Sequence, residues 1–267
     1  MTGRLIKLFG IVLLSGLLFS PDANAEGRSK EVGVLDYFSK YSGGTSYQLK
    51  AVKELYQVVE ETGISPEWVD VDIFLPDNRA KRDDYKRIVI PSPACWFTPK
   101  MLEGMEDYVK SGGLLITNSS LSILDKDDSY DVNSKNVVST RIPAQRFLGV
   151  SGQKSCNMKK IKIQPEMDCP LTKGLEKGTW LDLQMPMAGR VTRNVSAEKA
   201  IVSDCVQKEK VFAEQPFLTF KHLDNGACIY LVGQIRMPLK SMNDKNMVQI
   251  IRNIFSSETL EWLCGGD

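Results

Sequence analysis

The sequence predicts an α/β protein, a three-layer sandwich whose mostly parallel central sheet carries added antiparallel strands in the C-terminal half. Up to residue 120, short apolar runs of strand type alternate with longer segments of helical periodicity. That alternation is typical of crossover connections, which join parallel strands. From residue 158 the segments are shorter, richer in β-branched residues and separated by turns, which favours antiparallel strands.

The first predicted unit is a strand, a helix and a second strand. Residues 30–38 form an apolar run suited to a buried strand. Apolar residues three and four positions apart follow and predict one helix face. They are Leu49, Val52, Leu55, Tyr56 and Val59. Thr45 or Ser46 is the expected N-cap and Gly63 the stop, and residues 66–74 alternate like a strand.

The second predicted unit repeats this order. Residues 81–87 are expected to form an exposed turn that leads into a buried strand over residues 85–92. A helix is expected from Pro99 to Lys110, where a glycine pair ends it, and residues 114–120 continue as a strand. Four segments should form the centre of one parallel sheet: Val32–Asp36, Ile88–Ile90, Leu114–Thr117 and Ile229–Val232.

The C-terminal half completes the sheet and closes the fold. Five short segments are expected to be mostly antiparallel strands: residues 158–163, 180–185, 199–204, 210–214 and 216–221. Residues 226–235 predict a buried strand, and residues 244–257 an amphipathic closing helix.

The N-terminus has the layout of a secretory signal peptide over residues 1–25. Arg4 and Lys7 precede or flank a short apolar run, and a small-x-small triplet ends at Ala25. Cleavage would leave a single domain, residues 26–267, that is secreted or periplasmic, with no stable membrane span. The alternative is an uncleaved N-terminal anchor.

Charge and cysteine content limit the classes of partner and of site that the chain can have. Without residues 1–25 the chain has as many basic as acidic side chains, which does not favour a nucleic-acid partner. Six cysteines lie beyond residue 25, and an oxidising compartment allows disulfides. Cys156 with Cys169 and Cys205 with Cys228 are two possible pairs. One histidine and no CxxC motif predict no metal site, and no cofactor motif is present.

The segment Tyr85–Ser120, "YKRIVIPSPACWFTPKMLEGMEDYVKSGGLLITNSS", resembles a pattern of the class I glutamine amidotransferase-like superfamily. It is most similar to the branch that contains the β-galactosidase trimerisation domain. Further matches are "RFLGV" at residues 146–150, "CPLTKGL" at residues 169–175 and "LDNGACIYLVGQI" at residues 223–235. The resemblance covers most of residues 30–256 and implies a flavodoxin-like fold.

The resemblance does not imply an active amidotransferase, because the nucleophile position of active members corresponds here to "TNSSLS", residues 117–122, with no cysteine. Cys95 lies one strand earlier, in the loop that would help to form an oxyanion hole. The only histidine, His222, precedes its strand instead of following it. A cysteine nucleophile needs a base within hydrogen-bond reach, so we expect no catalytic residue and no Cys-His-Glu triad.

Ligands in open α/β sheets gather outside the carboxyl ends of the strands. The residues expected there include Tyr41 and Cys95 and six proposed ligand-binding residues, Asp36, Tyr37, Trp96, Asn118, Ser119 and Arg236. Aromatic rings could stack on a sugar while Asp36 and Asn118 bind its hydroxyl groups. The alternative is structural, with Arg236 paired to Asp36 and Trp96 covered by the loop at residues 125–140.

Two functions follow from these expectations. The first is a non-catalytic binding or assembly module linked to carbohydrate metabolism, either a homo-oligomer or the partner of a carbohydrate-related protein. The second is a small hydrolase or amidotransferase-like enzyme with a rearranged site. Proximity of Cys95 and His222 would favour the enzyme.

Overall fold

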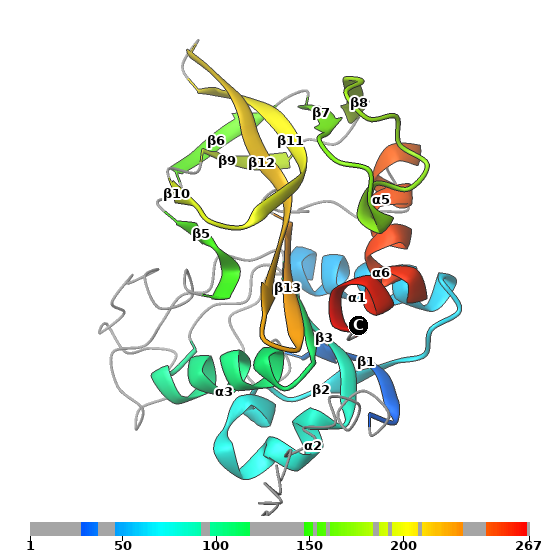
Figure 1. The fold of residues 1–267 in the computed structure, drawn as a ribbon, viewed down its shortest axis with the longest axis vertical. Coiled ribbons are helices and arrows are strands. Elements are labelled where there is room, and N and C mark those ends of the chain that lie inside the picture. The colour runs from blue at the N-terminus through cyan, green and yellow to red at the C-terminus, as the bar shows by residue number, and fades with distance from the viewer. Residues whose placement is uncertain are drawn as a thin grey trace, which may run out of the picture.

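The computed structural model describes ten ranges of the chain (Figure 1). They are residues 28–36, 46–91, 97–117, 147–151, 154–158, 161–183, 187–191, 194–207, 210–231 and 244–265. They form an α/β fold in which a mixed sheet of nine strands is packed against helices.

One half of the nine-stranded sheet is parallel. Its strand order is β2-β1-β3-β4-β13, and every neighbouring pair in it is parallel. These strands are β1 (Lys30–Leu35), β2 (Pro66–Val69), β3 (Tyr85–Ile90), β4 (Leu114–Thr117) and β13 (Gly226–Leu231). The four segments predicted as the centre of one sheet therefore do share a sheet, within the described residues.

The other half is antiparallel and continues from β13. Its strands are β12 (Lys210–Leu223), β11 (Glu198–Gln207), β7 (Ile161–Pro165) and β8 (Leu181–Leu183). Two small antiparallel sheets accompany it, formed by β5 (Val150–Ser151) with β10 (Asn194–Val195) and by β6 (Lys154–Met158) with β9 (Met187–Val191). The added antiparallel strands were predicted; they make up four of the nine strands, so the sheet as a whole is mixed.

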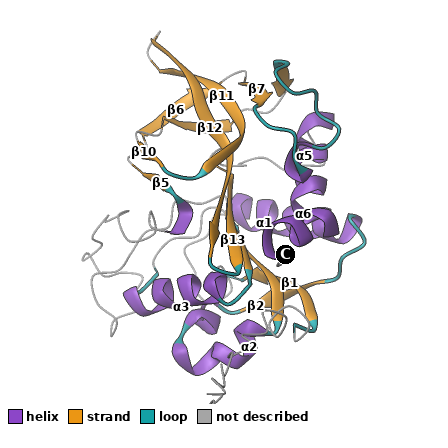
Figure 2. Ribbon diagram, viewed as in Figure 1, coloured by secondary structure: helices purple, strands orange, loops and turns teal. Residues whose placement is uncertain are grey.

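Helices cover both faces of the parallel half (Figure 2). On one face, α1 (Ser46–Glu61), α5 (Lys245–Phe255) and α6 (Ser257–Cys264) share an apolar cluster with Val34 of β1. On the other face, α3 (Pro99–Lys110) and the 3-10 helix η2 (Val71–Phe74) pack on Leu35. Alternate residues of each strand thus enter separate cores, which explains the continuous apolar runs.

Two predictions around β2 and β3 are wrong. Residues 66–74 are not one strand, because β2 ends at Val69 and η2 begins at Val71, where the Asp70 side chain accepts the N–H of Asp72. A short 3-10 helix, η3 (Pro76–Asn78), and α2 (Arg79–Asp83) follow. Residues 81–87 are not an exposed turn, since Arg82 and Arg87 are 2% and 1% exposed.

Both suggested disulfides are also wrong. Cys169 and Cys228 are free thiols, so neither the Cys156–Cys169 nor the Cys205–Cys228 pair forms. Cys228 is buried on β13, and Cys169 opens the 3-10 helix η4 (Pro170–Thr172).

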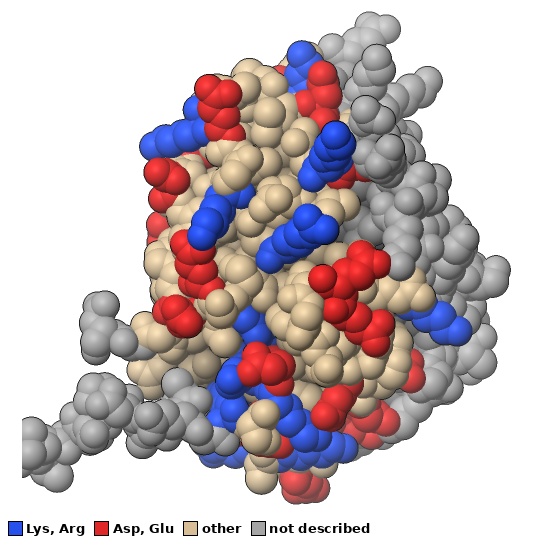
Figure 3. All heavy atoms as spheres, turned by 90° about the vertical axis from the view of Figure 1, so that its right-hand side faces the viewer, with Lys and Arg blue, Asp and Glu red and all other residues tan. Residues whose placement is uncertain are grey.

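Among the described residues, no helix is both long and apolar enough to span a membrane. On the face drawn in Figure 3, basic and acidic side chains are interspersed over an otherwise uncharged surface. That face carries no extended field of one sign, in keeping with the balanced composition.

Candidate functional site

The carboxyl ends of the five parallel strands meet at one edge of the sheet. Three of these ends, Ile90, Thr117 and Leu231, lie side by side because β4 pairs with β3 on one side and with β13 on the other. In a parallel α/β sheet this edge is where ligands bind, since the strand-to-helix loops start there. The described residues form the floor of such a site.

A small cavity lies under this edge, between the sheet and the helices α1 and α5. Its volume is about 20 Å³, and its lining is apolar apart from Thr117. The lining residues are Leu55, Val89, Ile90, Ile116, Thr117, Leu231, Ile251, Ile254 and Phe255. A water molecule needs two to four polar partners to stay in a cavity, so this lining favours an apolar group over water.

Asp36 is the one proposed ligand-binding residue that the structure describes. Its N–H donates to the carbonyl of Val69 at 2.7 Å, so the β1–β2 ladder continues to the end of both strands. This bond fixes the backbone of Asp36 at the predicted edge. The other five, Tyr37, Trp96, Asn118, Ser119 and Arg236, lie outside the described residues, as do Tyr41, Cys95 and the loop at 125–140.

His222 lies at the opposite edge of the sheet. It is paired across β12 and β13 with Ala227, which in turn pairs with Leu114, the first residue of β4. Parallel strands begin at this edge and end at Thr117 and Leu231. Leu231 lies four positions after Ala227 along β13, a span of about 13 Å.

The surroundings of His222 are aromatic. Its ring lies edge-on to Phe220 at 5.8 Å and to Trp262 of α6 at 6.3 Å between centroids. Such edge-to-face contacts are packing interactions. Within the described part of the chain, no group of three or more histidine, cysteine or carboxylate side chains is arranged to hold a metal ion.

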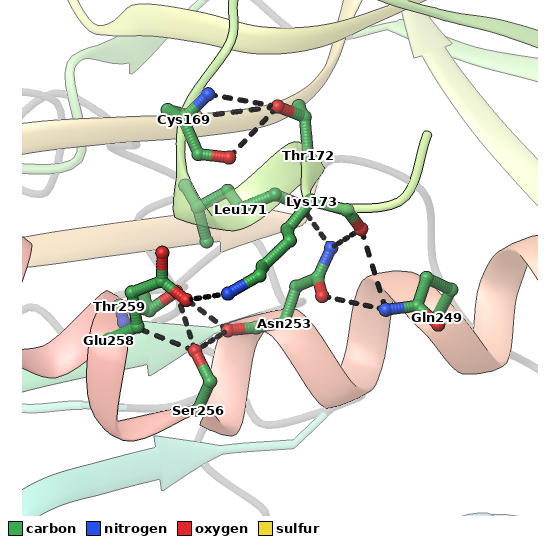
Figure 4. Close-up of polar contacts among 9 residues, drawn as sticks. All are labelled: Cys169, Leu171, Thr172, Lys173, Gln249, Asn253, Ser256, Glu258 and Thr259. Atoms are coloured by element: carbon green, nitrogen blue, oxygen red, sulfur yellow. Dashed lines mark hydrogen bonds and ion pairs between the residues drawn. The ribbon is translucent and has the colours of Figure 1, made fainter. Parts of the chain in front are cut away.

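The helix α5, which walls the cavity, is held in place by a polar clamp (Figure 4). Asn253 is 4% exposed, and its Nδ2 donates to the carbonyls of Leu171 at 3.1 Å and Lys173 at 2.9 Å. Its Oδ1 accepts from Nε2 of Gln249 at 2.9 Å. The amide nitrogen and the amide oxygen of this buried side chain thus both have hydrogen-bond partners, which offset the cost of its desolvation. The clamp gives the "CPLTKGL" segment a structural role.

Two further contacts fix the α5–α6 junction. The Ser256 Oγ accepts the N–H of Thr259 at 3.1 Å and so caps α6, while the Thr259 hydroxyl donates to the carbonyl of Asn253 at 2.7 Å. Arg87 of β3 donates through Nη2 to the carbonyl of Ser256 at 3.0 Å. Burial lowers the pKa of Arg87, and the charge of Glu31, 3.1 Å away, opposes that effect. The junction is thereby joined to the sheet.

An aromatic pair that the sequence pattern did not predict joins the outermost parallel strand to α1. Trp68 of β2 stacks on Tyr56 of α1, with ring centroids 4.6 Å apart and an interplanar angle of 16°. Trp68 is nevertheless 43% exposed. The helical periodicity assigned Tyr56 to the core, and nothing in the local sequence relates it to Trp68, which is twelve positions later in a different element.

Comparisons with known proteins define the fold and leave the family open. No protein-family model matches the chain, and no curated protein does either. Solved structures do match. A β-galactosidase from Rahnella sp. R3 superposes with a TM-score of 0.57 at 14% identity, over 87% of this chain and 31% of that one. The chain therefore spans about a third of that enzyme.

Two shorter proteins match over nearly their full length. A ThuA-like protein from Bacteroides uniformis has a TM-score of 0.54 at 13% identity and covers 88% of this chain and 93% of its own. The mmIFT52 N-terminal domain has a TM-score of 0.55 at 15% identity, over 89% and 99%. At these identities the similarity shows a shared fold. Function has to be argued from the site.

Proposed function

We propose that this chain is a non-catalytic binding or assembly module with the flavodoxin-like fold of the class I glutamine amidotransferase-like superfamily. The order β2-β1-β3-β4-β13 supports the fold, because flavodoxin-like sheets have the order 2-1-3-4-5. The likeness to the ThuA-like protein and to part of the β-galactosidase is in keeping with the superfamily and with its trimerisation-domain branch.

The position of His222 is the observation that carries the proposal. A cysteine nucleophile of this superfamily works at the edge where the parallel strands end and needs an adjacent base. The chain has one histidine, and it lies at the edge where these strands begin. A residue at the strand ends, where we expect Cys95, could therefore use it as a base only after a large rearrangement of β12.

The link to carbohydrates is also part of the proposal. The β-galactosidase from Rahnella sp. R3 acts on a sugar, as its name states, and a domain of this fold accounts for about a third of it. We propose that the present chain binds a carbohydrate at the strand-end edge or assembles with itself or with a carbohydrate-related protein. Asp36 stands at that edge.

The proposal includes export. Removal of residues 1–25 would yield a secreted or periplasmic protein with one domain, residues 26–267. N-terminal sequencing of the exported protein should start at Glu26. A chain that retains Met1 in the membrane fraction would contradict this part and would support an uncleaved anchor.

A comparison of three proteins tests the absence of catalysis. Wild type, Cys95→Ser and His222→Ala are assayed with glutamine, a nitrophenyl acetate ester and a nitrophenyl β-galactoside. We expect no turnover above buffer in any of them, and a single folded species by light scattering. Turnover by wild type that both substitutions abolish would establish the rearranged enzyme instead.

A further inference from the structure

The pair formed by Trp68 and Tyr56 is a preformed aromatic platform. An exposed apolar side chain that stands alone needs no functional explanation, but Trp68 is held in one orientation. Its ring is stacked on Tyr56, and the Tyr56 hydroxyl donates to the carbonyl of Pro66 at 2.5 Å, in the same strand as Trp68. The outer ring is therefore presented to solvent at little further cost in conformational entropy.

The platform adjoins the strand-end edge. Trp68 lies directly opposite Val34, and Asp36 follows Val34 by two positions in the same ladder. Because side chains alternate between faces, Asp36 belongs to the face of Val34, which is also the face covered by α1 and Tyr56. An aromatic face and a carboxylate thus stand side by side on the rim of the candidate site.

Further negative charge lies close to the rings. Glu60 follows Tyr56 by four positions in α1, and Glu67 precedes Trp68 in β2, so both carboxylates lie near the pair. Burial and then the charges of these two residues raise the pKa of Tyr56. Glu67 is engaged by Lys30 at 2.8 Å and by the Tyr85 hydroxyl at 2.9 Å. Glu60 lies in the last turn of α1, towards the edge where the parallel strands begin, so Asp36 is the carboxylate that shares the rim with Trp68. Carboxylates accept hydrogen bonds and donate none, which suits a ligand rich in hydroxyl groups.

The size of the platform argues against a protein partner. The exposed large apolar side chains of the described residues are Trp68, Trp180 and Val211. Trp68 lies on β2 at one end of the nine-stranded sheet, and Trp180 immediately precedes β8 at the other end. A stable protein interface buries more than about 1,000 Å², whereas one indole face matches one sugar ring.

We propose that Trp68, supported by Tyr56, is a carbohydrate subsite in which a neutral pyranose stacks on the indole and donates a hydroxyl hydrogen bond to Asp36. The C–H groups of a pyranose face are weakly positive and meet the negative face of the ring. The inference rests on the carbohydrate link of the proposed function and assigns it a second surface beside the strand ends.

The test measures binding of galactobiose and cellobiose to the full chain by calorimetry and by saturation-transfer NMR. Trp68→Ala should weaken the affinity about tenfold or more, and Asp36→Asn should weaken it less. Trp180→Ala is the matched control, because Trp180 is 39% exposed at the other end of the sheet, and it should bind like wild type. Thermal unfolding verifies the fold of each variant, and Trp68→Phe, with a smaller ring, should give an intermediate affinity.

Three outcomes would overturn the subsite. They are equal affinity of wild type and Trp68→Ala, no binding of either disaccharide to wild type, and binding of tetramethylammonium alone, which would make the platform a cation site. If Trp68→Ala does not fold, Trp68→Phe takes its place in the test. Affinities of Trp68→Phe and Asp36→Asn that both equal the wild-type affinity would then count against the subsite. Turnover of a disaccharide would contradict the non-catalytic function. It would not decide the subsite, because the dependence of binding on Trp68 could still be measured.

Discussion

His222 faces Ala227 across β12 and β13, at the edge where the parallel strands begin and away from the edge where their carboxyl ends meet. The contacts of the imidazole are with two aromatic rings, Phe220 and Trp262. In this position the histidine contributes to packing between α6 and the antiparallel strands. It is too far from the strand ends to take part in chemistry there.

Replacing His222 should therefore change little. The side chain is exposed, and loss of two edge-to-face contacts should lower the free energy of unfolding by about 1 kcal/mol or less. Urea unfolding of His222→Ala against wild type measures this. Phe220→Ala is the contrast, because Phe220 is 1% exposed and its loss should cost about 3–5 kcal/mol. A large loss in His222→Ala would mean that the histidine has a further partner.

The polar clamp on α5 should be sensitive to charge. Asn253→Asp keeps the shape of the side chain but places a second oxygen against the carbonyls of Leu171 and Lys173. Loss of both donated bonds with a buried charge should cost about 3 kcal/mol or more. Gln249→Glu, at the more exposed partner, should cost less. Chemical unfolding of both variants checks the order, and equal losses would contradict the clamp.

Gly104 of α3 allows the helix to approach η2 closely. A Cβ added there would lie 1.9 Å from the carbonyl oxygen of Phe74, which is backbone and cannot move alone. Gly104→Ala should therefore destabilise the protein by about 1–3 kcal/mol, although alanine is the better helix former. The control is Glu103→Ala on the exposed side of α3. Unchanged or raised stability of Gly104→Ala would show that the contact is looser than described.

The buried thiol of Cys264 should make the free energy of unfolding fall at alkaline pH. Burial raises the pKa of its thiol to about 11, with a backbone hydrogen bond from Ala227 opposing it. Because the folded-state pKa lies above the unfolded one, near 9, the contribution is complete below pH 9 and is lost as the pH rises towards 11. Cys264→Ala should remove roughly 1 kcal/mol of the loss in unfolding free energy between pH 8 and 10. Identical pH profiles would refute the assignment.

The sequence predicted most of the parallel half because its strands are apolar on both faces and its helices have strong periodicity. It mistook residues 71–74 for strand, since Val71 and Ile73 alternate with polar residues as strand residues do, and this alternation was given more weight than the local Asp70 cap that starts η2. It missed α6, whose start depends on the Ser256 cap.

The candidate site was only partly predictable. The sequence placed Asp36 at the edge where the parallel strands end and His222 at the opposite edge, and the structure has both residues there, since both positions follow from topology. The stacking of Trp68 on Tyr56 was not predictable, because it depends on how α1 packs against the first pair of strands. Likewise Arg82 and Arg87, in a charged stretch of sequence, proved buried. The pattern of charges along the sequence does not reveal which charged side chains are buried.

The reactivity of Cys95 shows whether this thiol is activated by a neighbouring base. Wild type and His222→Ala are treated with iodoacetamide near pH 6, and alkylation of each cysteine is followed by peptide mass spectrometry. An activated thiol reacts at this pH because a nearby base or cation stabilises its thiolate. If the chain is non-catalytic, Cys95 should be alkylated slowly and at the same rate in both proteins. Rapid, selective alkylation of Cys95 that is lost in His222→Ala would show a cysteine–histidine pair and would contradict the account.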